Sequence, residues 1–164
     1  MLALEISSMK QFMTRLLSAD TFDGFLLEEA TIRTATGYRI DGRMNPEFFP
    51  PEERDRTMIP YDFCPWSEMR GLCFDLIKGK YTPLHFKFVL QLKPELAERL
   101  LREHMEDISG VKALILTIRY DGGRAVLTTG ASHHTFVPDR EAERIWDNAL
   151  CKYLEEKGIG YEKL

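Results

Sequence analysis

The adjacent histidines His133 and His134 are the side chains best suited to bind a metal ion. Neighbouring residues on a strand point to opposite faces, so an extended backbone would keep the two rings from sharing one ion. A turn over residues 132–136 would weaken that objection and would leave His85, His104 or a cysteine as a further ligand. However, the chain contains no Cys-x-x-Cys or similarly spaced histidine motif. The sequence therefore favours structural or surface histidines and predicts neither a metal ion nor another cofactor.

The three cysteines, Cys64, Cys73 and Cys151, are odd in number and too widely spaced for a disulfide framework. Such cysteine usage is typical of a reducing compartment and predicts a cytoplasmic protein. Cys73 falls on the apolar stripe of a predicted helix, where a thiol acts as a small hydrophobic group. Cys64 is the better candidate for a reactive thiol, but the sequence indicates no base beside it. We predict no catalytic residue, and the signals weigh against an enzyme.

The segment from Trp66 to Lys80, which follows the most irregular part of the chain, is basic and aromatic and supplies most of the candidate binding surface. It could bind an anion or a partner protein. The alternative is a solvated helix face whose Arg and Lys stems cover apolar surface, and this alternative is favoured because such faces are usual on surface helices. Together with two histidines from later strands, the candidate surface comprises Trp66, Arg70, Lys78, Lys80, His85 and His133.

Length and composition place these residues in one domain spanning residues 1–164. Apolar residues make up 44% of the chain and charged residues 29%, which is typical of a globular protein. The formal net charge of −4 provides no general attraction to nucleic acid or to an anionic membrane. No stretch approaches the roughly 18 apolar residues of a membrane helix, and the first six residues lack the basic region of a signal peptide.

The first 41 residues predict a strand, a helix and two further strands. Apolar residues alternate over 2–6, which favours a short strand. Ser8 and Gln11 have the spacing of a capping box, and the apolar residues that follow have helical spacing. A strand over 25–34 comes next, and Gly37 allows a turn into a third strand.

Residues 42–65 form an irregular, proline-rich excursion from the domain rather than a linker between domains. A long loop inside a compact domain is usually functional or mobile. The excursion and its border carry aromatic residues that could anchor an interface, namely Phe48, Phe49, Tyr61, Phe63 and Trp66.

Periodicity predicts a second set of elements after this excursion. Asp121-Gly122-Gly123 indicates a tight hairpin; it lacks the Lys-Ser/Thr of a phosphate-binding loop and the helix that follows a dinucleotide-binding turn. The predicted elements are a helix over 67–78, a strand with one wet face over 84–92, a helix opened by Pro94, strands over 111–120 and 124–130, and a C-terminal helix over 138–157.

The order strand, helix, strand, strand occurs twice, over residues 2–41 and 84–130. Two such β-α-β-β units can form one antiparallel sheet with helices on one face, so we predict an α+β fold with an added C-terminal helix. This topology resembles half of a DNA clamp, although no residue motif supports that likeness. A generic α+β sheet with helices on one side is therefore the favoured interpretation, and the clamp-like arrangement is the alternative.

Several stretches also resemble a known family of small proteins. They are the opening Leu-Ala-Leu-Glu-Ile-Ser at 2–7 leading into 9–13, the segment 72–80 with Thr82-Pro83, and Leu-Thr-Thr-Gly at 127–130. Together they resemble a bacterial family of clostridial type, the domain of unknown function numbered 5721. The resemblance spans nearly the whole chain and implies no activity, cofactor or partner.

Two function classes follow from these observations. The favoured one is a non-catalytic binding or protein-interaction module with an unknown protein partner. The alternative is a small ligand-binding protein or enzyme whose pocket lies between the sheet and the 42–65 loop. Its polar candidates are Glu28, Glu29, His85 and His133.

A DNA clamp in function as well as in shape is disfavoured. The predicted helix after Pro94 carries more acidic than basic residues, whereas a clamp presents Lys and Arg to phosphates. We therefore expect no nucleic-acid binding. Free sheet edges leave open a homodimer.

Overall fold

The computed structural model describes all 164 residues and contains one antiparallel sheet of eight strands. Seven strands follow the order β3-β2-β5-β6-β7-β1-β8, and the short β4 pairs with β2 beside β3. The strands are β1 (Ala3–Ile6), β2 (Phe25–Arg33), β3 (Gly37–Asp41), β4 (Cys64–Pro65), β5 (His85–Leu92), β6 (Val111–Asp121), β7 (Arg124–His133) and β8 (Tyr161–Lys163).

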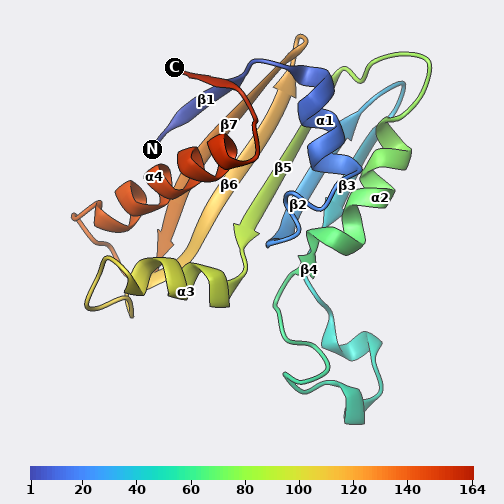
Figure 1. Ribbon diagram of the computed structural model, residues 1–164. Helices are drawn as coiled ribbons and strands as arrows, with labels where there is room; N and C mark the ends of the chain where they lie inside the picture. The colour runs from blue at the N-terminus through green and yellow to red at the C-terminus, as the bar shows by residue number, and fades with distance from the viewer.

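All four helices lie over the same face of this sheet, which leaves the opposite face uncovered (Figure 1). The predicted α+β architecture with helices on one face is therefore confirmed. The helices are α1 (Met9–Leu17), α2 (Trp66–Ile77), α3 (Pro94–Arg102) and α4 (Glu141–Glu156), with 3-10 turns at Pro46–Phe48 and Pro51–Glu53. None of the helices is long and apolar enough to cross a membrane.

The β-α-β-β order does occur twice, as β1-α1-β2-β3 and as β5-α3-β6-β7. The two copies nevertheless enter the sheet differently. In the second copy β5 pairs with β6, whereas β1 is separated from β2 and pairs with β7 and β8 instead. The repeated pattern therefore builds one sheet from two non-equivalent halves.

The core lies between the helices and the covered face. Residues that alternate along β5 and β6 fill it, because every second side chain of a strand points to the same face. Phe86 and Tyr120 are cross-strand neighbours whose rings stack at 4.9 Å, and Phe86 also stacks on Phe88 at 5.0 Å. Phe88, Leu90, Leu116 and their neighbours on the covered face are completely buried.

The hairpin between β6 and β7 has the predicted tight turn. Asp121 pairs with Arg124, so only two glycines connect the strands. Gly122 and Gly123 have φ angles of 58° and 81°, the left-handed region that favours glycine in a two-residue hairpin turn.

Three local predictions need correction. Ser8 is the N-cap of α1, but its side chain makes no capping hydrogen bond, so the predicted capping box is absent. The last helix begins at Glu141 rather than at residue 138, because the Asp139 carboxylate accepts the Glu141 N–H at 3.0 Å. Strands β4 and β8 were not predicted, since two or three residues are too short to show a period.

Candidate interaction surfaces

The segment between β3 and β4, residues 42–63, leaves the edge of the sheet and extends away from it, and we call it the arm (Figure 1). The predicted excursion over 42–65 therefore ends two residues earlier, because Cys64 and Pro65 pair with β2. The two ends of the arm are joined by backbone hydrogen bonds from Cys64 N to Gly42 O at 2.8 Å and from Met44 N to Asp62 O at 2.8 Å. An isolated antiparallel bridge between Arg43 and Phe63 lies between these bonds. The arm is therefore closed at its base like a short hairpin.

Gly42 fixes this base to strand β2. Its N–H donates to Glu28 O at 2.9 Å, at the place where the register of β2 shifts between Leu27 and Glu29. A Cβ at position 42 would lie 1.8 Å from the Leu27 carbonyl oxygen, which no side chain allows. Close backbone approach therefore requires glycine at the root of the arm.

Bonds within the arm hold its outer part in one shape. Arg54 donates from Nε to Phe49 O at 2.8 Å, and Arg56 pairs with Asp62 at 2.7 Å. The Asp55 carboxylate accepts the hydroxyl of Thr57 and nearby backbone N–H groups, which lowers the pKa of Asp55. The irregular sequence thus forms an ordered structure of its own.

A large aromatic side chain is exposed on this ordered arm. Phe48 is 83% exposed, and its ring meets the ring of Phe49 edge-on at 5.3 Å. Met58 is 56% exposed, whereas Ile59 beside it is buried. Of the aromatic residues predicted as anchors, Phe48 is the one that the arm presents most fully.

Tyr61 ties the arm to helix α3. Its hydroxyl donates to the Glu95 carboxylate, and Lys93 lies 5.6 Å from the centre of its ring. The hydrogen bond to Glu95, with burial second, raises the pKa of Tyr61 to about 12. The neutral phenol is the donor, so the contact holds throughout the neutral pH range.

Three arginines of the arm, Arg43, Arg54 and Arg56, are among the residues that line a cavity of about 330 Å³. Asp62 is the one acidic residue of this lining. Arg43 lies over the ring of Phe63 at 5.2 Å and makes no ion pair. We call this cavity the arginine hollow. No sequence pattern indicates this hollow, because only the folded arm brings residues 43 and 56 together.

The first residue of α2, Trp66, does not lie on the surface that was predicted for this segment. Trp66 is 0% exposed: its indole N–H donates to Leu16 O at 3.0 Å and its ring lies 5.1 Å from that of Phe88. The prediction that Trp66 lies on a binding surface is wrong, because the tryptophan joins α1 and α2 to the sheet. Arg70 lies nearby and is held by Asp23 at 3.0 Å.

The two lysines of that predicted surface lie beside aromatic rings. Lys78 pairs with Asp75 at 3.0 Å and lies 5.7 Å from the centre of the Phe74 ring. Lys80 is placed in the same way, 5.6 Å from the centre of the Tyr81 ring. In both cases the ammonium group lies over the face of an exposed ring, the arrangement of a cation–π contact.

The four polar candidates for a catalytic or ligand pocket do not line one cavity, although the hollows of Glu29 and His85 adjoin at Arg39. Glu28 and Glu29 line a hollow beside the base of the arm. His85 lies on the uncovered face with Arg33 and Arg39. His133, at the end of β7, lines a cavity of about 490 Å³ with His104. The structure does not bring these four residues together, nor does it place three or more His, Cys, Asp or Glu side chains to hold a metal ion.

Two cysteines, Cys64 and Cys73, lie in environments that raise the pKa of their thiols and keep them protonated. Burial raises the pKa of the Cys73 thiol to about 12, in agreement with its place on the apolar stripe of α2. Burial, followed by a hydrogen bond to the Glu68 carboxylate, raises the pKa of Cys64 to about 11. A raised pKa makes each thiol a poor nucleophile at neutral pH.

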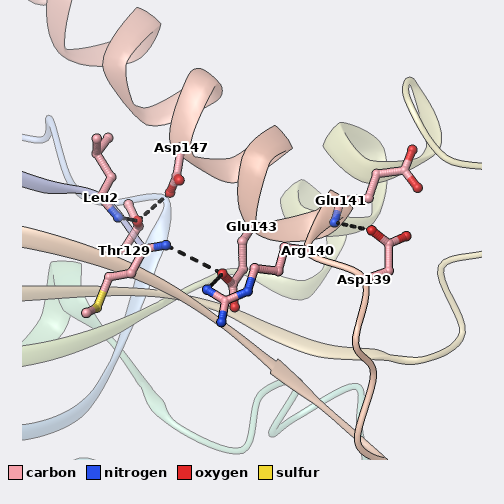
Figure 2. A network of polar contacts seen from close by, with 8 residues as sticks. Leu2, Thr129, Asp139, Arg140, Glu141, Glu143 and Asp147 are labelled. Atoms are coloured by element: carbon pink, nitrogen blue, oxygen red, sulfur yellow. Dashed lines mark hydrogen bonds and ion pairs between the residues drawn. The ribbon is translucent and has the colours of Figure 1, made fainter.

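Polar contacts fasten α4 to the first residues of the chain and to β7 (Figure 2). The Thr129 hydroxyl accepts the Leu2 N–H at 3.0 Å and donates to the Asp147 carboxylate of α4. Glu143 lies between Arg140, at 3.7 Å, and the N-terminal ammonium group, at 3.5 Å. Each group has a structural partner, so this network positions the helix.

Fold and surfaces define a class of small α+β protein in which helices cover one face of an open antiparallel sheet and an ordered arm projects from its edge. The chain belongs to the family of unknown function DUF5721, whose model matches residues 15–162. This match confirms the family resemblance found in the sequence. No curated protein and no solved structure matches the chain.

Proposed function

We propose that the protein is a non-catalytic interaction module that binds a protein partner through its arm. The observation that carries this proposal is Phe48, an aromatic side chain left 83% exposed on a segment whose own shape is fixed. Aromatic residues are enriched among the anchors of protein interfaces, where they fill pockets of the partner. Phe48, together with the exposed Met58 of the same arm, would form the apolar part of this contact.

The fixed shape of the arm supports the same role. Binding through a flexible loop is weaker because its side chains and backbone torsions lose conformational entropy when they become ordered. Closure of the base at Gly42, the bonds of Arg54 and the tether of Tyr61 to Glu95 order the arm before any partner arrives. More of the energy of burying Phe48 then remains as affinity.

The environments of the candidate nucleophile and base residues support a non-catalytic role. The Cys64 and Cys73 thiols have raised pKa values, and the histidines His85 and His133 lie in different hollows. General base catalysis requires a base within hydrogen-bonding reach of the group that it activates.

Affinity purification with a tagged full-length chain tests the proposal. The Phe48→Ser variant is compared with Tyr81→Ser, which removes an equally exposed aromatic ring, 79% exposed, outside the arm. We expect a partner that is retained by the wild type and by Tyr81→Ser and lost, by at least tenfold in yield, with Phe48→Ser. A partner set unaffected by Phe48→Ser contradicts the role of the arm.

The arginine hollow supports a second candidate function, the binding of a small anion. Arg43, Arg54 and Arg56 supply three positive charges against the single carboxylate of Asp62. Guanidinium groups suit phosphate and carboxylate ligands because they present several N–H donors in one plane.

Thermal unfolding with inorganic pyrophosphate tests this second function. Pyrophosphate is expected to raise the Tm of the wild type and of Arg99→Ala, a control at an exposed arginine of α3, but not that of Arg56→Ala. Equal shifts in all three proteins would argue for non-specific binding and against the hollow.

We further propose that the module works in the bacterial cytoplasm. The support is the cysteine usage, since Cys64, Cys73 and Cys151 are all free thiols. A clamp-like topology remains a hypothesis supported by the two β-α-β-β orders. Helix α3 carries two acidic and two basic residues, Glu95 and Glu98 against Arg99 and Arg102, because it ends before the acidic residues that follow it. It therefore has no excess of basic residues, which supports a module that does not bind nucleic acid.

A further inference from the structure

Two pairs of like charges lie directly opposite each other on the uncovered face of the sheet. Lys87 of β5 faces Arg119 of β6, and Glu5 of β1 faces Glu162 of β8. Like charges in such cross-strand positions destabilise a sheet. Neither Lys87 nor Arg119 makes an ion pair within the chain, whereas Glu5 accepts a bond from Arg124 Nε at 3.1 Å.

Both pairs belong to one row of cross-strand neighbours and lie on either side of Val126 of β7. From β5 to β8 the row runs Lys87, Arg119, Val126, Glu5, Glu162, and Thr31 and Arg39 continue it onto β2 and β3. Over the five strands from β5 to β8 the charges are two positive, one neutral and two negative, so this part of the row is complementary to its own reverse. A two-fold axis along β7 would place each cation of one copy over a carboxylate of another.

The row beside it leaves room for a second sheet to approach. From β5 to β1 it consists of Val89, Thr117, Thr128 and Ala3, which are small or β-branched and uncharged, and it continues to Glu29 only on β2. On the other side Arg124 lies on β7 itself, but its bond to Glu5 draws its guanidinium group towards β1. No bulky side chain along the neutral row therefore holds two such faces apart.

We propose that the uncovered face is an interface between two copies of this chain, packed sheet against sheet about a two-fold axis along β7. Lys87 then meets Glu162 of the second copy, and Arg119 meets Glu5 of the second copy. Packed sheets lie about 10 Å apart, a gap that a lysine or arginine and a glutamate span together. The contact is isologous, so each ion pair occurs twice.

This interface goes beyond the proposed role of the arm and leaves the arm free. With the axis on β7, the strands β5 to β8 of the two copies lie over one another in the order given by the sheet. Strands β2 and β3, from whose edge the arm departs, extend past the second copy. A dimer would therefore present two arms, one at each end.

Charge reversal at the two ends of the row tests the proposal. Sedimentation equilibrium of the wild type at low salt is expected to give twice the 19.0 kDa mass of one chain. Lys87→Glu and Glu162→Lys should each weaken the dimer about tenfold or more, because each change places like charges together twice. Lys152→Glu, the same change of charge on the exposed side of α4, should leave the dimer intact.

Combining the two changes distinguishes a contact between copies from an effect inside one chain. Residues 87 and 162 lie on β5 and β8, four strand spacings apart in the sheet, or about 19 Å. The double variant Lys87→Glu/Glu162→Lys should recover the dimer, and mixing the two single variants should give a heterodimer of near wild-type affinity.

A wild-type chain that remains a monomer at about 100 µM and low salt overturns the proposal, since a specific homodimer is populated at that concentration. A dimer that none of the reversals weakens, or a double variant no better associated than the single ones, also overturns it. Circular dichroism confirms that each variant is folded. The arm experiment with Phe48→Ser has a separate readout, so either proposal can fail alone.

Discussion

The two faces of the sheet are built from alternate residues of the same strands, and they differ in the side-chain pairs that can lie opposite each other on neighbouring strands. On the covered face Phe86 of β5 and Tyr120 of β6 stack their rings at 4.9 Å. One residue further along each strand, Lys87 and Arg119 meet with like charges on the uncovered face. Burial forces the first pair to be complementary, whereas water screens the second and lets an unfavourable pair persist.

The largest expected difference between the faces is at two adjacent residues of β5. Phe88→Ala should lower the free energy of unfolding by about 3–5 kcal/mol, because Phe88 is fully buried between Trp66 and Phe86. Val89→Ala on the uncovered face should cost about 1 kcal/mol or less. Urea denaturation measures both variants. Equal losses would show that the uncovered face is packed as tightly as the covered one.

A smaller difference is expected at two adjacent threonines of β7. Thr129→Val removes the hydroxyl that joins the Leu2 N–H to Asp147 and should cost about 1–3 kcal/mol, since a polar group is left unpaired near the core. Thr128→Val on the uncovered face should change stability by less than about 0.5 kcal/mol. If Thr129→Val were as neutral as its neighbour in thermal unfolding, the network in Figure 2 would not stabilise α4.

Removing one cation from the uncovered face should stabilise a single chain slightly. Lys87→Thr ends the repulsion with Arg119 and should raise the free energy of unfolding by about 0.2–0.5 kcal/mol when it is measured on dilute, monomeric protein. The gain should vanish near 1 M salt, where charges are screened within about 3 Å. A loss of stability at low salt would contradict the assignment of the two side chains to one row.

The smallest effect concerns Glu5, which Arg124 holds on the same face. The hydrogen bond from Arg124 lowers the pKa of Glu5 below its ordinary value of 4.5. Because the folded pKa is the lower one, the stabilisation is present above pH 4.5 and is lost as the pH falls through the folded pKa. NMR titration should show the Glu5 carboxyl returning to its ordinary pKa in Arg124→Ala. A titration unchanged by that substitution would place Arg124 elsewhere.

Much of the local structure follows from the sequence, because its causes act over a few residues. Alternation along β5 and the apolar stripe that buries Cys73 follow from the period of a single element. The turn after Asp121 follows from two adjacent glycines that accept positive φ angles. Residues 42–65 show no such period and were predicted as an irregular excursion, and the role of Phe48 as an interface anchor stays a prediction. The local pattern was misleading at Trp66, because burial beside Leu16 depends on packing between two helices.

Strand order and register were decided by the tertiary structure alone. The Leu2 N–H reaches a hydroxyl 127 residues away, and Glu5 and Arg124 are 119 residues apart in the chain. Such pairing is selected by the total burial of the sheet and helices, which no local period contains. The sequence by itself therefore determined which side of the longer strands, such as β5 and β6, would face water. Only folding decided which charges would meet there, because register across strands is a property of the whole sheet.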